Sequence, residues 1–422
     1  MTQTPATPTP MSATPTDLQD ERLLRPTGFG GTVGASIRRV RGGDLGSLPV
    51  VVGLVVIWAV FEVLNSAFLT PGNLSDLLVQ SAATGVISVG IVLVLLLGQI
   101  DLSVGSVAGL ASAILGVLLV QYHWPEWLII PAVVLAGVVI GLVYGFLFVR
   151  FGVPSFVITL AGLLSVLGLQ LFVLGPLGTI NLGFTSFITE FSLLLFVPPW
   201  LTYVLAAIAA VGYGATAYLS ASKRRNAGLS APSLAWTLIK AAILLVFMVV
   251  GSAYLNTSVT GGIGDSFVLL VVLVVIMNYA LTRTKWGRSV FAVGGNVEAA
   301  RRAGIRVNRV YVSVFVLCSA FAAMGGLLLA GNLGSASPST GTTDTNLNAI
   351  AAAVIGGTSL FGGRGSAYSA LLGIVVIQSI SNGLGLLSLD SSVRYMVTGV
   401  VLLLAVIVDS LSRRSRTAHG RA

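Results

Sequence analysis

Charge is the scarcest property of this 422-residue chain. Only 9% of its residues are Asp, Glu, Lys or Arg, whereas 55% are hydrophobic. Soluble domains carry about 25% charged residues, so this composition excludes a soluble protein and indicates an integral membrane protein. The net charge of +9 does not require a nucleic acid partner, because basic loops alone supply it. For most of these charges, anionic membrane lipids are the expected partner.

Lysine, histidine and cysteine are nearly absent, and their scarcity excludes several chemistries. The three lysines, Lys223, Lys240 and Lys285, are followed by Arg, Ala and Trp, so no P-loop can form and the chain is not expected to hydrolyse ATP itself. Two histidines and the single Cys318 cannot build a metal cluster or a disulfide within the chain. No catalytic triad or carboxylate pair is evident either, so we expect neither an enzyme nor a cofactor.

Long apolar stretches fill most of the remaining sequence. About twelve of them approach the roughly 20 residues that span the hydrocarbon core as a helix. They predict an all-α integral membrane protein, a polytopic bundle of about 12 transmembrane helices (about 10 to 12), with broken helices and a cytoplasmic coupling helix. The expected spans begin near Leu48, Leu77, Val104, Leu128, Phe156, Trp200, Leu234, Ser266, Val310, Ala349, Ala367 and Val393. The third and the tenth are short and glycine-rich.

The ends of the chain differ from the apolar body. Residues 1–47 include the Thr/Pro tract MTQTPATPTPMSATPT, which is predicted to be a disordered, basic cytoplasmic segment without a cleavable signal peptide. Residues 48–410 form the predicted membrane domain, and residues 411–422 a basic cytoplasmic tail. With both termini inside, the positive charges fall in inner loops and only Arg394 lies outside, as the positive-inside rule requires. We therefore expect a multi-pass protein of the plasma (inner) membrane.

Polar side chains inside the spans are candidates for a translocation path. Nearly all are neutral amides or hydroxyls, the groups that hydrogen-bond an uncharged polar solute such as a sugar. Interhelical hydrogen bonds that hold the spans together are an equally open interpretation of each residue. The acidic and basic exceptions, Glu62 and Lys240, are expected to reach toward water. The main neutral residues are Gln80, Ser81, Thr159, Ser165, Gln170, Asn278, Gln378, Ser379, Ser381 and Asn382.

Two glycine-rich interruptions suggest broken helices. The first, GQIDLSVGS, holds Asp101, which we expect at a helix break because an ionised carboxylate at the bilayer centre costs about 3 kcal/mol. Asp101 or Ser103 can cap the following span, with Gly98 and Gly105 bracketing the break. The second, GGTSLFGGRGS, contains Arg364, a hypothetical partner of Asp101. Matching breaks in two halves of a transporter point to its site or gate.

The basic loop 283–309 is predicted to carry a short helix. Its sequence from Thr284 to Val310 is TKWGRSVFAVGGNVEAARRAGIRVNRV. Asn296 can cap this helix, Glu298 lies in its first turn, Arg301 near its last, and Gly304 fits the left-handed residue that ends it. So short a helix is unstable alone in water and needs a partner, either the lipid surface and the rest of the loop or a separate cytoplasmic protein.

Four ordered motifs resemble those of a known family. GQIDLSVGS resembles the GGIDLSVGS signature of permease subunits of monosaccharide ABC importers, the ribose and xylose group, with Gln99 as a departure. VPSFVITLAGLLSVLGL, GRSVFAVGGNVEAARRAGIRV and GGTSLFGGRGS are similar to its fifth-span, coupling and late glycine-rich segments. The extra spans around residues 223–265 are most similar to xylose-type permeases.

The resemblance implies a set of partners and roles. These are a cytoplasmic ABC ATPase subunit, an extracytoplasmic sugar-binding protein and a second permease copy in a homodimer. A groove of the ATPase would take the coupling residues Gly295, Asn296, Glu298, Ala299, Ala300, Arg301 and Gly304. The candidates for the translocation path or gate are Gln80, Ser81, Asp101, Ser103, Arg364, Gln378 and Asn382. We thus expect a permease for xylose or a related pentose.

Three alternatives stay open at this point. A multiple-monosaccharide or ribose-type permease is similar in sequence. An ion-coupled secondary transporter would use Glu62 or Asp101 as its ion site. A structural or channel-like membrane protein would pass solute without any ATPase.

Overall fold

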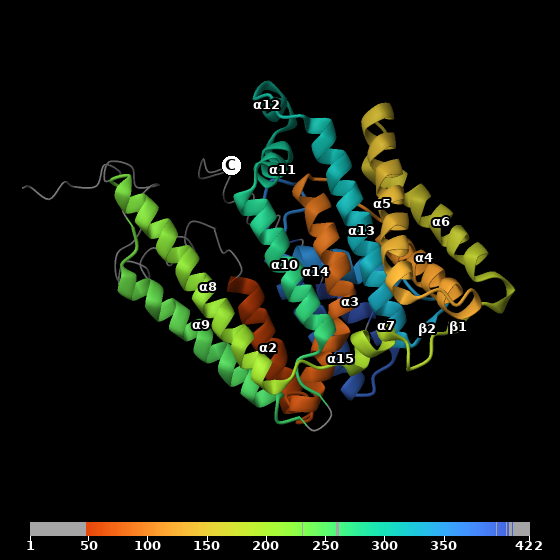
Figure 1. Cartoon of the computed structure of the whole chain (residues 1–422), viewed down its shortest axis with the longest axis horizontal. Helices are drawn as coiled ribbons and strands as arrows, with labels where there is room; N and C mark the ends of the chain where they lie inside the picture. Colours follow the sequence, from red (N-terminus) through yellow and green to blue (C-terminus); the bar gives the residue numbers. More distant parts are fainter. Residues whose placement is uncertain are drawn as a thin grey trace, which may run out of the picture. The chain divides into compact units, whose positions relative to one another are not determined.

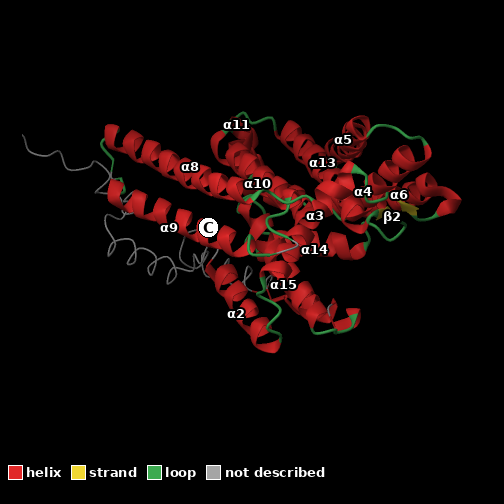
Figure 2. Ribbon diagram, turned by 60° about the horizontal axis from the view of Figure 1, so that its bottom comes forward, coloured by secondary structure: helices red, strands yellow, loops and turns green. Residues whose placement is uncertain are grey.

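The computed structural model describes residues 48–229, 231–258, 261–393, 395–401, 403, 404 and 407. The predicted segments 1–47 and 411–422, as well as Arg394, lie outside these residues. Within the described part the chain is almost wholly helical, with two strands of two residues each (Figure 2). An all-α membrane protein is therefore confirmed.

The chain divides into two compact units. Residues 198–253 belong to the first, and residues 48–197 and those from 254 onward to the second. The first unit contains α8 (Pro199–Asn226) and nearly all of α9 (Leu234–Leu255). Most side chains of both helices are exposed, as in helices that face lipid. In the connection between them, Arg225 donates a hydrogen bond of 2.9 Å to the carbonyl of Pro232.

Nine helical segments of the described residues are long and apolar enough to cross a membrane, and each coincides with an expected span. Those of the second unit are α3 (Pro71–Leu96), α4 with the π-turn η2 (Val104–Gln121), α5 (Glu126–Phe151), α6 (Ser155–Leu174), α10 (Asp265–Arg283), α13 (Val307–Leu333) and α15 (Tyr368–Leu386). The expected first and tenth spans are shorter: α2 (Leu48–Leu64) has 17 residues and α14 (Thr343–Ile355) has 13. The expected twelfth span, helical at 391–393 and 395–401, is described only in part.

The smaller elements of the second unit connect these spans. They are η3 (Gly175–Leu177), β1 (Ile180–Asn181), α7 (Phe187–Thr189), η4 (Glu190–Leu194), α11 (Lys285–Gly295), α12 (Val297–Arg302) and β2 (Ser335–Ala336). Strand β1 pairs antiparallel with β2, with Ile180 opposite Ala336. The carboxylate of Glu126 accepts hydrogen bonds of 2.8 Å from the amides of Phe187 and Ile188 and so fixes the start of α7.

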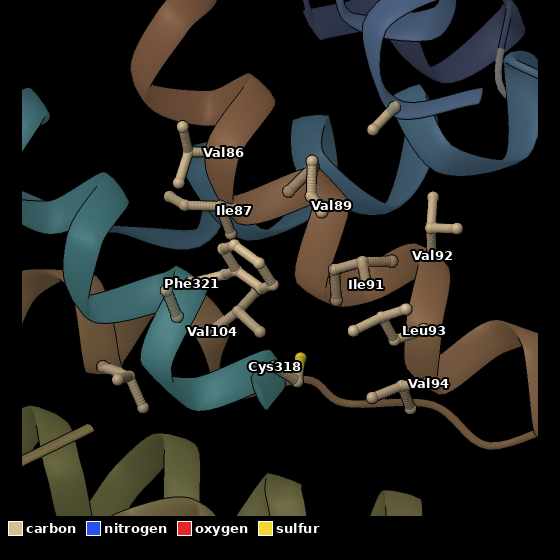
Figure 3. Close-up of a cluster of buried hydrophobic side chains, with 14 of the residues drawn as sticks. Val86, Ile87, Val89, Ile91, Val92, Leu93, Val94, Val104, Cys318 and Phe321 are labelled. Carbon is tan, nitrogen blue, oxygen red and sulfur yellow. The ribbon is translucent and has the colours of Figure 1, made fainter. Parts of the chain in front are cut away.

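Helix α3 lies at the centre of the second unit, where it packs against α13, α15, α10 and α14 (Figure 1). It begins at Pro71, a residue whose fixed φ suits the first helical turn, and its second half is almost continuously buried. Figure 3 shows aliphatic side chains of α3 around Cys318 and Phe321 of α13. Cys318 is fully buried, as expected for a small packing residue.

Glycines let α5 run against α13. A Cβ at Gly137 would lie 2.6 Å from the carbonyl oxygen of Ser319, and one at Gly141 would lie 2.5 Å from that of Phe315. At Gly145 it would come within 2.8 Å of the Cα of Val312. These three glycines, spaced four residues apart, thus form a small-residue surface on which the two helices pack.

Candidate functional site

A row of polar side chains follows the first three turns of α3, a helix that is otherwise mostly apolar. Asp76 and Gln80 are exposed one helical turn apart, and Asn73 lies about one turn before Asp76. The adjacent helix α15 contributes Gln378 and Asn382. We call these five residues the amide surface.

Hydrogen bonds across the amide surface join the two helices. The side-chain nitrogen of Gln378 donates to the side-chain oxygen of Gln80 at 2.7 Å. Asn73 and Asn382 donate to each other, both at 2.9 Å. Three of the predicted path residues, Gln80, Gln378 and Asn382, thus come together although about 300 residues separate the two helices in sequence.

Ser81 lies apart from this surface. Its side chain is fully buried, and its hydroxyl donates to the carbonyl of Leu77 one turn earlier in α3, at 2.7 Å. Conversely, Asp76 and Asn73 were not predicted. The second span was expected to begin near Leu77, so both residues fell outside it, whereas α3 begins at Pro71. The three- and four-residue spacings of Asn73, Asp76 and Gln80 were the available signal.

The first break lies between α3 and α4, as predicted. Gly98 takes a left-handed φ of 68° directly after α3. Gly105, by contrast, is inside α4, where a Cβ would lie 2.6 Å from the carbonyl oxygen of Gly341. It is therefore a packing glycine and does not bracket the break.

Asp101 is 1% exposed in this break, and one of its carboxylate oxygens accepts two hydrogen bonds from Ser103. The backbone amide of Ser103 donates at 2.8 Å and its hydroxyl at 2.7 Å. Ser103 is the residue that precedes α4, but its side chain makes no capping bond. Asp101 thus stabilises the turn that leads into α4. It does so by binding Ser103, the residue before the helix, and not by capping the amides of the first helical turn as predicted.

Side chains from two other helices form hydrogen bonds with three further backbone groups of the break. The amide of Leu102 donates to the hydroxyl of Thr159 at 3.1 Å, and that of Ile100 to Ser155 at 3.3 Å. Asn346 of α14 donates to the carbonyl of Leu102 at 2.7 Å. Non-helical backbone in a membrane requires such internal partners. Thr159 is therefore explained as a structural residue, one of the two interpretations left open by the sequence.

The second break, residues 356–366, meets the first. The amide of Gly363 donates a hydrogen bond of 2.8 Å to the carbonyl of Leu96, the last residue of α3. Arg364, in the same loop, is exposed, whereas Asp101 is buried and bonded to Ser103. The hydrogen bonds described for the Asp101 carboxylate come from Ser103, so the structure gives no support to the hypothetical pairing with Arg364.

The loop after α10 forms two helices, of which only the second was predicted. Thr284 caps the start of α11, because its hydroxyl accepts a hydrogen bond of 3.1 Å from the amide of Gly287. The helix buries Val290 and Val293 against the bundle. The sequence interpretation passed over α11, although its apolar residues three apart are a helical signal.

Helix α12 has the predicted form. The side-chain oxygen of Asn296 accepts the amide of Ala299 at 2.9 Å, which confirms the cap, and Gly304 takes a φ of 79° just after the helix. Glu298 lies 3.7 Å from Arg301 and 3.4 Å from Arg302, and all three side chains are more than half exposed.

The other residues of this segment differ in exposure. Gly295, Ala299 and Gly304 are exposed, but Ala300 is only 4% exposed and faces the core of its own unit. A surface that binds another protein can therefore include the charged face of α12 but not Ala300. Its buried methyl group instead holds the helix against the bundle.

Comparisons with known proteins place the chain among transport permeases. Residues 73–406 match the family model described as the permease component of the branched-chain amino acid transport system. The xylose transport system permease protein of Escherichia coli (strain K12) is 34% identical over 83% of this chain and 88% of its own length. The fructose import permease protein of Rhizobium meliloti is 30% identical over 87% and 86%, and the ribose import permease protein of Escherichia coli (strain K12) is 30% identical over 85% and 92%.

No solved structure gives a significant match. The sequence relatives confirm the resemblance to importer permeases of the xylose and ribose group that the four motifs predicted. The chain therefore belongs to the permease family that these xylose, fructose and ribose permeases represent.

Proposed function

We propose that this chain is the membrane-spanning permease subunit of an ATP-driven importer for xylose or a related pentose. The observation that carries the proposal is the amide surface of α3 and α15, where Gln80 and Gln378 are hydrogen-bonded to each other at an exposed place in apolar spans. Exposing amides to lipid alone is unfavourable, whereas a sugar or water can hydrogen-bond them. The similarity to xylose permeases supports the choice of sugar.

The same surface supports a second copy of the chain as a partner. In a homodimer, two amide surfaces facing each other would enclose a path, with Asp76, Gln80 and Gln378 in contact with the sugar. Asp101, Ser103 and Arg364 act in this proposal by holding the two breaks beside the path. Ser81 has no role in it, because its hydroxyl is bonded within α3.

Energy comes from outside the chain in this proposal. The chain itself is not an enzyme, and a cytoplasmic ABC ATPase binds the exposed face of α12 through Asn296, Glu298, Ala299 and Arg301. An extracytoplasmic binding protein delivers the sugar to the opposite side. This arrangement requires α12 and both termini to be cytoplasmic, as the distribution of basic residues supports.

Reconstitution tests the function. The permease, its neighbouring ATPase and its binding protein are placed in proteoliposomes, and uptake of radiolabelled xylose is compared with uptake of ribose, fructose and other monosaccharides. We expect uptake that needs internal ATP and persists when ionophores collapse the ion gradients. Uptake that follows an ion gradient without ATP would instead establish a secondary transporter. ATP-driven uptake with a preference for ribose or for several sugars would correct only the substrate.

A further inference from the structure

The end of α11 meets both helix breaks at one point. Gly294 lies so close to the carbonyl of Leu96 that a Cβ at this position would overlap the carbonyl oxygen. The same Cβ would lie 2.8 Å from the nitrogen of Gly363, which donates its hydrogen bond to that oxygen. Gly294 therefore lies directly beside a backbone hydrogen bond between two other segments far apart in sequence, with no room for a side chain.

A second contact completes the arrangement. Gly362 has a φ of 82°, and a Cβ there would lie 2.7 Å from the carbonyl oxygen of Gly294 and 2.8 Å from the nitrogen of Gly98. A Cβ at Gly98 would be 3.3 Å from the carbonyl oxygen of Phe361. We call Gly98, Gly294, Gly362 and Gly363 the glycine joint, since backbone touches backbone at all four.

The glycine joint adjoins α12 on one side and the ends of two membrane helices on the other. Asn296, which caps α12, follows Gly294 by two residues, so α12 is attached directly to the joint. On the other side, α3 ends at Leu96 and carries Gln80, and the loop with Gly362 leads into α15, which carries Gln378. Close-packed backbone has little compressibility, so it passes on a displacement that flexible side chains would absorb.

We propose that the glycine joint transmits movement of α12 to the ends of α3 and α15, and so to the amide surface, with Gly294 as its positioning residue. The proposal rests on the proposed function, in which an ATPase moves α12. Helix shifts of about 1–2 Å at an interface are typical of such transitions. A shift of that size cannot be lost at the joint, because no gap separates its three segments.

The test is Gly294→Ala in the complete importer, reconstituted with ATPase and binding protein. Three quantities are measured: ATPase retained on purification, ATP hydrolysed, and sugar imported per ATP. We expect the ATPase to remain bound and active, because α12 is unaltered, while sugar imported per ATP falls by about tenfold. Gly168→Ala in α6 is the matched control, because nothing lies within 4 Å of its Cβ.

A milder variant covers the case in which Gly294→Ala does not assemble. Gly98→Ala adds one tight contact and the strain of a left-handed residue, and Gly152→Ala, with φ of 66° and nothing within 4 Å, supplies the same strain alone. We expect Gly98→Ala, but not Gly152→Ala, to lower sugar imported per ATP.

The proposal for the glycine joint is overturned if Gly294→Ala or Gly98→Ala imports sugar per ATP within twofold of wild type. It is also overturned if both variants fail to assemble while their controls assemble. The proposed function fails differently. In that case the unaltered complex itself shows no ATP-driven uptake or does not retain the ATPase.

Discussion

Gln378 donates a hydrogen bond of 2.7 Å to Gln80, which joins α15 to α3 at an exposed position. A side-chain amide has two donor hydrogens and an acceptor oxygen, so this single bond leaves both residues able to bind further polar groups. The pair is thus a structural link and a candidate sugar contact at once.

Replacing Gln80 by Leu separates these two roles. If Gln80 contacts the sugar, Gln80→Leu should raise the KM for xylose uptake by about threefold to tenfold, the value of one hydrogen bond. If it only links helices, thermal stability falls and KM stays constant. Gly168→Ala in α6, whose added methyl group meets open space, is the control and should change neither. An unaltered KM in Gln80→Leu and in Gln378→Leu would remove the pair from the path.

The role of the Asp101 carboxylate can be tested by replacing it with the amide of Asn or the methyl group of Ala. Asp101→Asn keeps the oxygen that accepts from Ser103, whereas Asp101→Ala leaves a buried amide and hydroxyl without that partner, at a cost of about 1–3 kcal/mol. We expect the Asn variant to melt and transport like wild type, and the Ala variant to melt at a lower temperature in detergent. Loss of transport in a stable Asn variant would show that the charge itself is needed, as an ion-coupled mechanism requires.

The local features of the site could be predicted from the sequence, and the distant contacts could not. The Asn296 cap and the turn at Gly304 depend on neighbours within a few residues, and both are confirmed. The contact of Gly98 with Gly362 joins residues more than 260 positions apart, and glycine spacing alone does not reveal which backbone another will touch. Asp76 was missed for another reason: hydropathy places the start of a span to within a few residues, and this acid lies in the first turns of α3.

Charge reversal on α12 tests the docking surface. Because Glu298, Arg301 and Arg302 are exposed, their mutual ion pairs contribute only about 0–1 kcal/mol, so Glu298→Lys with Arg301→Glu should leave the fold intact. We expect the double variant to be produced at normal levels but to lose the ATPase on purification and, with it, uptake. Lys285→Glu, an exposed change at the start of α11, is the control. Full ATPase retention by the double variant would place the docking surface elsewhere.

Packing between α5 and α13 gives a prediction about stability alone. Gly141→Ala puts a methyl group 2.5 Å from the carbonyl oxygen of Phe315 and 2.6 Å from the Cα of Val316, so the helices must move apart. Overpacking of this kind costs about 1–3 kcal/mol. We expect a lower melting temperature in detergent, measured against Gly168→Ala, whose added methyl group meets open space. Equal melting temperatures would mean that the two helices separate without cost.

The orientation of the chain can be settled with single cysteines. After Cys318→Ser removes the one native thiol, Glu298→Cys places a thiol on α12 and His123→Cys places one in the exposed connection between α4 and α5. The distribution of basic residues predicts that position 298 lies inside and position 123 outside the cell. A membrane-impermeant maleimide applied to intact cells should therefore label position 123 and leave position 298 unlabelled until the membrane is opened. The reverse pattern would place α12 out of reach of any cytoplasmic ATPase, and the proposed energy coupling would fail even if sugar transport were observed.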